Sequence, residues 1–303
     1  MIALQKSDIK ARPLIMGAVR RLGVKELQPF VESLRTSGYR GDCVLFTTSI
    51  SSATFRYLLD RGIRTIPFFY PAIKNHQPLL YGWGLWRHFL GLAKNREVRL
   101  KIARLVWDLV YLRFLFERNF LISHPEYTEI LLTDVRDVIF QRNPFLWMKG
   151  QEGVFCFEEY AGRKIGACSS NSRMVLEVFG QPGWKELKGC AVSCSGVIFG
   201  TRGALLGYLE RFLDLALAGK ALRPSSGSDQ GIHNYIVHRQ NLPGLKLSSN
   251  EGPVFTMGCV PQGSILTNTQ NEIVNQSGSV YPVLHQYDRF PDLKKILTAK
   301  YFG

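Results

Sequence analysis

Hydrophobic and polar positions alternate along the first 70 residues in the pattern of a strand–helix–strand–helix–strand protein. Three short apolar runs predict buried strands and span 13–18, 43–46 and 63–69. Between them, apolar side chains recur at helical spacing over 25–34, and Ser51 or Ser52 can cap a second helix that reaches Leu59. Pro29 lies inside the first helical window, so the regular helix is expected to begin there. This order of elements predicts a parallel sheet with right-handed crossovers.

The most apolar stretch of the chain spans 102–121 and contains four charged residues: Arg104, Asp108, Arg113 and Glu117. These charges argue against a membrane span. They predict one long, mostly buried helix along which Arg104 pairs with Asp108 and Arg113 pairs with Glu117, four residues apart. The preceding segment, 70–95, is irregular and aromatic. Its aromatic side chains either pack in the core or shape a pocket.

The rest of the chain continues the alternation of strands and helices. Further strands are predicted at 130–132, 153–157 and 191–199, and further helices at 172–179, 201–218 and 228–237. Within 191–199, the small residues 193–196 allow a ligand or another backbone to approach closely. No internal repeat or low-complexity linker divides the sequence. We therefore expect one α/β domain over 1–303, with a Rossmann-type mixed sheet flanked by helices.

Composition and charge narrow the class of partner. With 303 residues, 46% of them hydrophobic and 20% charged, the chain can bury a sizeable core. Its formal net charge of +14 suits nucleic acid, an anionic membrane surface or phosphorylated substrates. The basic residues are scattered, and no zinc-finger or RNA-recognition signature is present, so nucleic acid is not the expected partner.

The cysteines and the N-terminus indicate the compartment. None of the six cysteines forms a C-x-x-C pair, which argues against structural zinc. Reduced thiols in a cytoplasmic protein are the default, although an even count also permits disulfides. The N-terminus lacks the apolar segment of a secretory signal. We expect a cytoplasmic protein, for which peripheral contact with a membrane stays open.

The stretch ILLTDVRDVIFQRNPF, residues 130–145, places two carboxylates at the exit of a buried strand. Asp134 and Asp137 lie beside core sequence, where carboxylates need a partner. Arg136 between them is one candidate, in a surface turn. The other is a divalent cation such as Mg²⁺ or Mn²⁺, which one or two carboxylates and substrate phosphates typically hold.

Two further polar groups follow predicted strand or helix boundaries. Asp229 and Gln230 begin a helix, and His285 follows an apolar run near the C-terminus. Taken alone, Asp229 is a helix cap and His285 a structural histidine. Ligands of open α/β sheets bind beyond the carboxyl ends of the strands, where these groups could meet. Together, Asp134, Asp137 and His285 would offer two hard oxygens and an imidazole, a set that suits Mn²⁺.

Four segments in this order resemble those of the GT-A type glycosyltransferases, the nucleotide-diphospho-sugar transferases. LLTDVRDVIFQRNPF resembles their acidic metal-binding motif, SCSGVIFGT their donor/acceptor strand, SDQGIHNYIV the Asp-Gln element that follows it, and VLHQYDR their C-terminal histidine segment. The resemblance spans roughly Pro13 to Arg289. The chain departs from the usual Asp-x-Asp motif, because its two acids are separated by two residues, Val135 and Arg136.

The resemblance implies a GT-A-like fold, with a nucleotide-sugar-binding half over 1–145 and an acceptor-side half over 146–303. It implies transfer of a sugar from a UDP- or GDP-linked donor to a hydroxyl of a glycan, polysaccharide or glycolipid, with Mn²⁺ or Mg²⁺ as cofactor. It also implies site residues. The metal ligands would be Asp134, Asp137 and His285; the donor-binding residues Gly17, Ala18, Arg20, Arg21, Asp134 and Arg136; and the catalytic base Asp229, with Glu158 and Glu159 as rivals.

Two other functions remain compatible with the sequence. A non-catalytic basic module that binds nucleic acid or anionic lipid would account for the net charge. Another metal-dependent phosphate enzyme, such as a nucleotidyltransferase, would account for the acidic residues, although a glycine-rich phosphate loop is missing.

Overall fold

A computed structural model describes residues 12–70, 93–160, 162–218 and 228–301. Its main element is a seven-stranded sheet in the order β3-β2-β1-β4-β7-β6-β8. The strands are β1 (Pro13–Arg20), β2 (Asp42–Thr48), β3 (Arg64–Pro67), β4 (Glu129–Thr133), β6 (Val154–Phe157), β7 (Val197–Thr201) and β8 (Leu245–Ser248). β1 to β4 run parallel, β7 is antiparallel to both its neighbours, and β8 is parallel to β6. The predicted Rossmann-type mixed sheet is confirmed.

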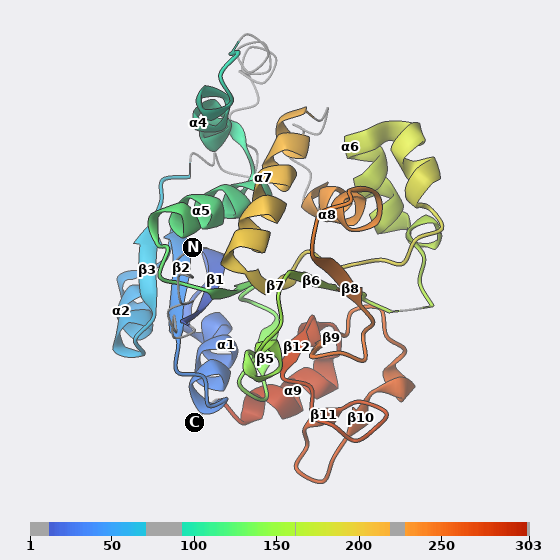
Figure 1. The fold of residues 1–303 in the computed structure, drawn as a ribbon. Helices are drawn as coiled ribbons and strands as arrows, with labels where there is room; N and C mark the ends of the chain where they lie inside the picture. The colour runs from blue at the N-terminus through green and yellow to red at the C-terminus, as the bar shows by residue number, and fades with distance from the viewer. Residues whose placement is uncertain (1–11, 71–92, 161, 219–227, 302–303) are drawn as a thin grey trace, which may run out of the picture.

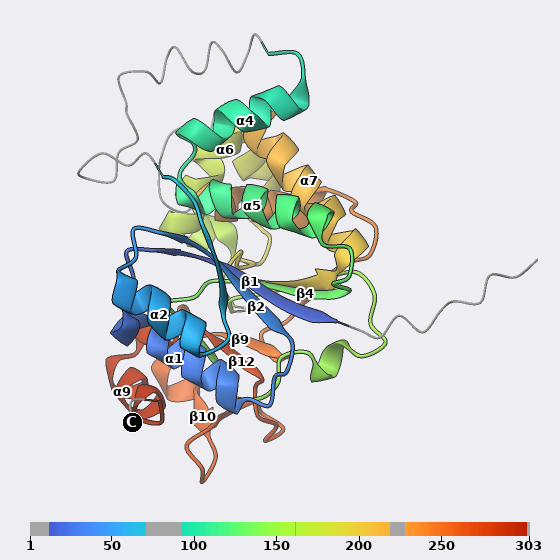
Figure 2. The same cartoon turned by 90° about the vertical axis from the view of Figure 1, so that its left-hand side faces the viewer.

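Helices cover both faces of this sheet (Figures 1 and 2). On one side of the sheet lie α5 (Leu109–Ser123), α6 (Ser169–Leu187), α7 (Arg202–Ala218) and α8 (Ser228–Arg239), with α4 (Arg96–Val106) beyond α5. The other carries α1 (Val24–Thr36) and α2 (Ser52–Asp60). Successive side chains of a strand point to opposite faces. Leu14 and Met16 of β1 therefore pack with α5 and α7, whereas Ile15 packs with α1.

A second, three-stranded sheet lies on the α1 side of the main sheet (Figure 1). Its strands are β5 (Val138–Phe140), β12 (Val283–His285) and β9 (Val254–Thr256), with β12 in the middle. A hairpin of β10 (Leu266–Thr267) and β11 (Ile273–Val274) and the helix α9 (Pro291–Ala299) complete this region. The short 3-10 helices are η2 (Leu146–Met148), η3 (Ile165–Ala167), η4 (Gln262–Ser264) and η5 (Tyr287–Arg289).

Strand pairing joins the two halves that the sequence resemblance implies. β4, from the first half, is hydrogen-bonded to β7, from the second. β5, which directly follows the acidic segment, pairs with β12, which lies almost 150 residues further along the chain by sequence. The pairing matters for the site because it aligns His285 with Val138, the residue after Asp137.

The prediction of one long helix over 102–121 is wrong. The helix breaks between α4 and α5, where Trp107 is extended and the Asp108 carboxylate accepts a hydrogen bond from the amide of Val110. Asp108 is therefore the N-cap of α5 and not a helical partner of Arg104. Arg104 instead lies over the ring of Phe116, 5.8 Å from its centroid.

Other element boundaries also differ from the sequence prediction, among them those of the helix predicted over 172–179, which is α6 and spans Ser169–Leu187. α1 begins at Val24 and not at Pro29, because Glu26 accepts a hydrogen bond from the amide of Gly23 and so starts the helix earlier. β7 begins at Val197, because Ala191 and Ser193 in the segment before it form isolated bridges, to Lys164 and Glu158, and no continuous strand. Most of the aromatic segment, 71–92, and the loop before α8, 219–227, lie outside the described residues.

The structure bears on two of the sequence expectations, the state of the cysteines and the lack of a membrane span. All six cysteines are free thiols. Among the described helices, none combines the length and the apolar character needed to cross a bilayer.

Candidate functional site

A cavity of about 540 Å³ opens beyond the carboxyl ends of β1 and β4. The chain leaves β1 towards β2 and β3 and then returns to the opposite side of β1 at β4, so this is the topological switch point of the sheet. β1 contributes Ala18 and Arg20 to the cavity wall, and the segment after β4 contributes Asp134, Arg136 and Asp137. The cavity thus lies where ligands bind in open α/β sheets.

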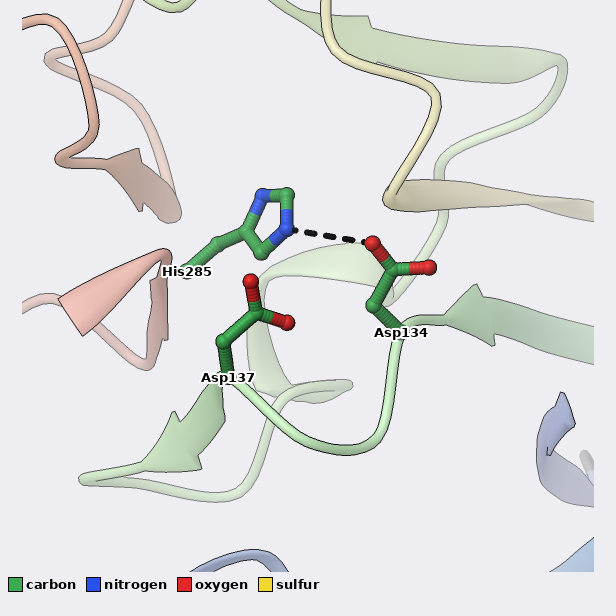
Figure 3. A group of neighbouring side chains, drawn as sticks. All are labelled: Asp134, Asp137 and His285. Atoms are coloured by element: carbon green, nitrogen blue, oxygen red, sulfur yellow. Dashed lines mark ion pairs between the residues drawn. The ribbon is translucent and has the colours of Figure 1, made fainter. Parts of the chain in front are cut away.

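Asp134, Asp137 and His285 form a cluster at this cavity (Figure 3). One ligand atom from each lies within 4.8 Å of the others, and His285 Nε2 is 3.5 Å from Asp134 Oδ2. Two atoms on opposite sides of an ion, each at roughly 2.0–2.6 Å, would be about 4–5 Å apart. His285 Nε2 is buried and has no hydrogen-bond partner in the described part of the chain. The spacing, the orphaned nitrogen and the donor types fit a divalent cation.

The backbone places each of these side chains. The amide of Asp134 donates a 2.7 Å hydrogen bond to the carbonyl of Gly196, and the amide of Gln286 donates a 2.8 Å hydrogen bond to the carbonyl of Asp137. On its other side, the His285 ring has Nδ1 3.4 Å from Thr256 Oγ1 on β9. Such a contact orients an imidazole so that Nε2 faces a metal. Strand pairing and one hydroxyl therefore aim His285 at the two acids.

At Gly196, beside the cluster, a side chain would not fit. A Cβ there would lie 2.4 Å from His285 Cε1 and 2.6 Å from both Asp134 Oδ2 and His285 Nε2. These distances are shorter than real Cβ contacts, so the ring and the carboxylate would have to separate. The small residue in this strand is needed because two ligand side chains occupy the space above it.

We therefore expect Gly196→Ala to weaken Mn²⁺ binding by at least about tenfold. Displacing a metal ligand should lower the metal affinity at least as much as the loss of a hydrogen bond that supports a ligand. Isothermal titration with Mn²⁺ measures the effect. Gly203→Ala in α7 is the matched control, because a Cβ there meets nothing within 4 Å. Equal Mn²⁺ affinity in the two variants would show that Gly196 does not protect the metal centre.

Arg113 on α5 connects the metal cluster to a third acid. It donates hydrogen bonds to Asp134, to Asp229 at 3.0 Å and to the carbonyl of Ser195 at 3.1 Å. Burial disfavours the guanidinium charge, but Asp134 and Asp229 outweigh it and raise the pKa of Arg113. The predicted helical pair with Glu117 is not formed: Arg113 turns to the cavity, and Glu117 Oε2 has no hydrogen-bond partner among the described residues.

The charges in the cluster act on one another. Burial raises the pKa of Asp134, but Arg113 and His285 outweigh burial and lower it. Burial is the largest influence on Asp137 and raises its pKa. His285 is also buried, which lowers its pKa, but Cys194, Asp134 and Asp137 raise it well above its usual value. A cation in the cluster would compensate both carboxylates at once.

Asp229 is part of the cavity wall and does not cap α8. It is the second residue of that helix and is buried, with 5% of its surface exposed. Its Oδ2 accepts hydrogen bonds from Arg113 and, at 3.1 Å, from the hydroxyl of Ser195. Burial raises the pKa of Asp229, although Arg113 opposes this. A carboxylate with a raised pKa suits a proton acceptor.

A fully buried histidine anchors the helix that carries Asp229. His233 lies one turn further along α8, with Nε2 2.8 Å from Ser193 Oγ and Nδ1 2.7 Å from the Tyr208 hydroxyl. Ser193 Oγ donates to the carbonyl of Phe157, so the His233 Nε2–H donates to Ser193 and Nδ1 accepts from Tyr208. Burial lowers the pKa of His233 to about 3.

The low pKa of His233 predicts that the free energy of unfolding decreases in acid. Below an unfolded pKa of about 6.5, the unfolded chain binds a proton at His233 that the folded chain does not, so the free energy of unfolding falls as pH decreases towards 3. Between pH 7 and pH 5 we expect His233 to account for a loss of about 2 kcal/mol. Urea denaturation of wild type and His233→Gln at both pH values measures it. The same loss in both proteins would contradict the prediction.

Four residues proposed from the sequence lie off the cavity wall. Arg21 follows β1 on the exposed surface, and Gly17 is packed so closely that a Cβ would lie 2.6 Å from Val135 Cγ2. Glu158 is half-buried and pairs with Ser193 through its backbone. Glu159 is buried and accepts a 2.9 Å hydrogen bond from Gln230 Nε2. The structure brings the other predicted residues, Ala18, Arg20, Asp134, Arg136, Asp137, Asp229 and His285, to this cavity or directly behind it.

Arg113, Ser195 and Arg289 are among the cavity residues that sequence reasoning missed. For Arg113 a signal was present, because an arginine in a helix as apolar as α5 must have a partner. For Ser195 the only signal is the stretch of small residues around it, which does not show that its hydroxyl has a partner in Asp229. Arg289 lies in the same segment as His285. It is far from the acidic residues along the chain, so the sequence does not show that they are close in space.

Fold and site together define a mixed α/β protein with a candidate divalent-metal centre at the carboxyl edge of its sheet. Comparison of the chain with models of known protein families finds no match, and a search among curated proteins finds no significant similarity.

Proposed function

We propose that the protein is a glycosyltransferase that depends on a divalent metal ion. It would transfer a sugar from a nucleotide-diphosphate donor to a hydroxyl of a glycan, polysaccharide or glycolipid. The observation that carries the proposal is the convergence, in one cavity at the switch point, of the Asp134–Asp137–His285 cluster with four arginines and Asp229.

The charge of the cavity wall suits a diphosphate. Four arginines, Arg20, Arg113, Arg136 and Arg289, line it together with three aspartates. All four arginines already interact with acidic or aromatic groups: Arg113 with Asp134 and Asp229, Arg136 and Arg289 with Asp288, and Arg20 with the ring of Tyr70. A bound Mn²⁺ or Mg²⁺ would add two positive charges, which the diphosphate of a nucleotide-sugar would match.

The chain's own residues divide the chemistry between them. Asp134, Asp137 and His285 would hold the cation, which as a Lewis acid neutralises charge on the diphosphate leaving group. Arg136 and Arg289, with side chains 56% and 54% exposed, lie at the cavity and can bind phosphate oxygens. Asp229, held by Arg113 and Ser195, is positioned to receive a proton from an acceptor hydroxyl or to hold that hydroxyl.

A thermal-shift screen of UDP- and GDP-sugars with and without Mn²⁺ tests the proposal. At a donor concentration about 100 times its Kd, binding adds about 2.7 kcal/mol of stability, which raises the Tm by roughly 5 °C for a protein of this size. The shift should require metal and be followed by slow hydrolysis of the donor. Failure of every donor to shift the Tm would contradict the proposal.

Two other assays, added to this screen, separate the alternative functions. A nucleotidyltransferase would release pyrophosphate from a nucleoside triphosphate and an acceptor. A basic binding module would bind RNA or anionic vesicles with a steep dependence on salt and would show no metal-dependent response to nucleotide-sugars.

A further inference from the structure

A second cavity lies on the other side of the wall that supports the metal cluster. Its volume is about 190 Å³, and its lining comes from the segment after β6, the loop before β9, and the β10–β11 hairpin region. This cavity is smaller than the roughly 300–1,000 Å³ of pockets for drug-sized ligands. It has room for one ring-sized group and not for a nucleotide.

Aromatic side chains form part of its lining. The rings of Phe255 and Tyr281 are stacked, 4.6 Å apart and 10° from parallel. Both are buried, whereas Tyr160 on the same cavity is 37% exposed. Apolar C–H faces of a ligand pack on such rings, which supply a large rigid contact area. This part of the lining therefore suits a ligand with an apolar face.

Polar groups alternate with these rings along the lining. The Tyr281 hydroxyl donates to Glu251 Oε2 at 3.3 Å, and both Glu251 and Gln276 are exposed to solvent. A carboxylate and a side-chain amide beside an aromatic surface offer acceptors and donors to a ligand that carries several hydroxyls. The lining thus combines the two requirements of a pyranose ring, an apolar face and a hydroxylated edge.

Charge distinguishes this cavity from the first. Glu251 is the one charged residue among its lining residues, as far as the chain is described, whereas four arginines line the first cavity. In a protein with a net charge of +14, a lining with an acidic residue and without basic ones disfavours anionic ligands. Phosphorylated sugars and uronic acids are thereby disfavoured relative to an uncharged sugar.

The wall between the two cavities is continuous and hydrogen-bonded. Asn250, on the second cavity, donates to the carbonyls of Glu159 and Thr256. The Glu159 carboxylate accepts from Gln230, which lines the first cavity. Thr256 in turn contacts His285. A group bound in the second cavity would therefore lie next to the scaffold of the proposed reaction centre.

We propose that the second cavity is a saccharide subsite that binds one uncharged pyranose ring of the acceptor. Its assignment to an acceptor rests on the proposed glycosyltransferase function, whereas its binding of an uncharged sugar rests on the lining alone. Tyr160 would stack on the ring, and Glu251 would accept hydrogen bonds from its hydroxyls.

Saturation-transfer difference NMR tests the subsite on the intact protein. The probes are the methyl glycosides of glucose, galactose, mannose, N-acetylglucosamine and N-acetylgalactosamine, with methyl glucuronide as the charged comparison. We expect at least one uncharged glycoside to bind and the glucuronide to bind at least tenfold more weakly. Tyr160→Ala and Glu251→Gln should each weaken that binding at least fivefold. Phe69→Ala, which removes a ring that is 78% exposed elsewhere, should leave it unchanged.

The outcomes separate the subsite from the proposed function. Lack of binding by every uncharged glycoside, or binding that survives both Tyr160→Ala and Glu251→Gln, would overturn the subsite even if nucleotide-sugars bind with Mn²⁺. Sugar binding that depends on Tyr160, in a protein without any metal-dependent response to nucleotide-sugars, would support the saccharide site and reject the transferase. A preference for the charged glucuronide would overturn the argument from charge.

Discussion

Asp137→Asn is expected to weaken metal-dependent nucleotide-sugar binding by at least about 100-fold while the protein remains folded. The substitution replaces a hard anionic oxygen of the proposed metal shell with a neutral amide. Loss of a supporting outer contact alone costs about 10–100-fold in metal affinity, and loss of a ligand costs more. Titration with Mn²⁺ followed by a UDP- or GDP-sugar measures both steps.

Stability separates this result from misfolding. Asp137 is 7% exposed, and burial is the main cause of its raised pKa, so its charge is unfavourable in the absence of metal. Removing that charge should leave the Tm of the metal-free protein unchanged or slightly higher. The matched control is Asp292→Asn, whose side chain is 83% exposed on α9. If Asp137→Asn and Asp292→Asn bind Mn²⁺ equally well, Asp137 is a structural residue.

The local parts of the fold follow from periodicity and turn chemistry. The strands β1, β2, β4 and β6 and the helices α2 and α7 lie close to their predicted positions, because each has a buried apolar pattern and a clear boundary signal. Ser51 shows this well: its hydroxyl accepts from the amide of Thr54 and starts α2 as expected. These boundary signals are local, because each depends on only a few neighbouring residues in the sequence.

Predictions failed where tertiary contacts override local pattern. The segment 102–121 has the composition of one helix, yet Asp108 interrupts it by capping the next one. Arg113 and Glu117 have the spacing of a helical pair, yet Arg113 gains more from two carboxylates, Asp134 and Asp229, that come from distant segments. No local pattern shows that these acids lie within its reach.

The site illustrates the same limit. Asp134 and Asp137 could be singled out because acids beside a buried strand need partners. Their approach to His285 depends on the pairing of β5 with β12, which a single sequence does not reveal. The need for glycine at position 196 depends on the packing of three strands and could not be predicted to the atom.

Asp229→Asn is expected to lower sugar transfer by roughly 10²–10⁴-fold, the usual loss when a general base is removed, while donor binding stays near wild type. The side-chain hydrogen bonds to Asp229 from Arg113 and Ser195 reach one atom, Oδ2. An asparagine whose amide oxygen takes that place keeps these two bonds and loses the negative charge. Arg113 retains Asp134 as its ionic partner.

The cost to stability should be small, because Asp229 does not cap its helix. It lies in the first turn of α8, where a negative charge is favourable by about 0.3–1 kcal/mol. A fall in Tm of a few degrees is therefore the most that the lost charge should cause. Circular dichroism melting and a donor-binding titration establish that the variant is folded and binds the donor before transfer is measured.

Glu158→Gln and Glu159→Gln complete the comparison, because these acids are the rivals for the role of base. Neither lies on the cavity wall, and the Glu159 carboxylate already accepts from Gln230 and the Cys259 thiol. We expect Glu158→Gln to transfer sugar at the wild-type rate and Glu159→Gln to lose less than tenfold, through displacement of Gln230. Undiminished transfer by Asp229→Asn, together with a large loss in Glu158→Gln, would move the base to Glu158 and leave Asp229 as the partner that orients Arg113.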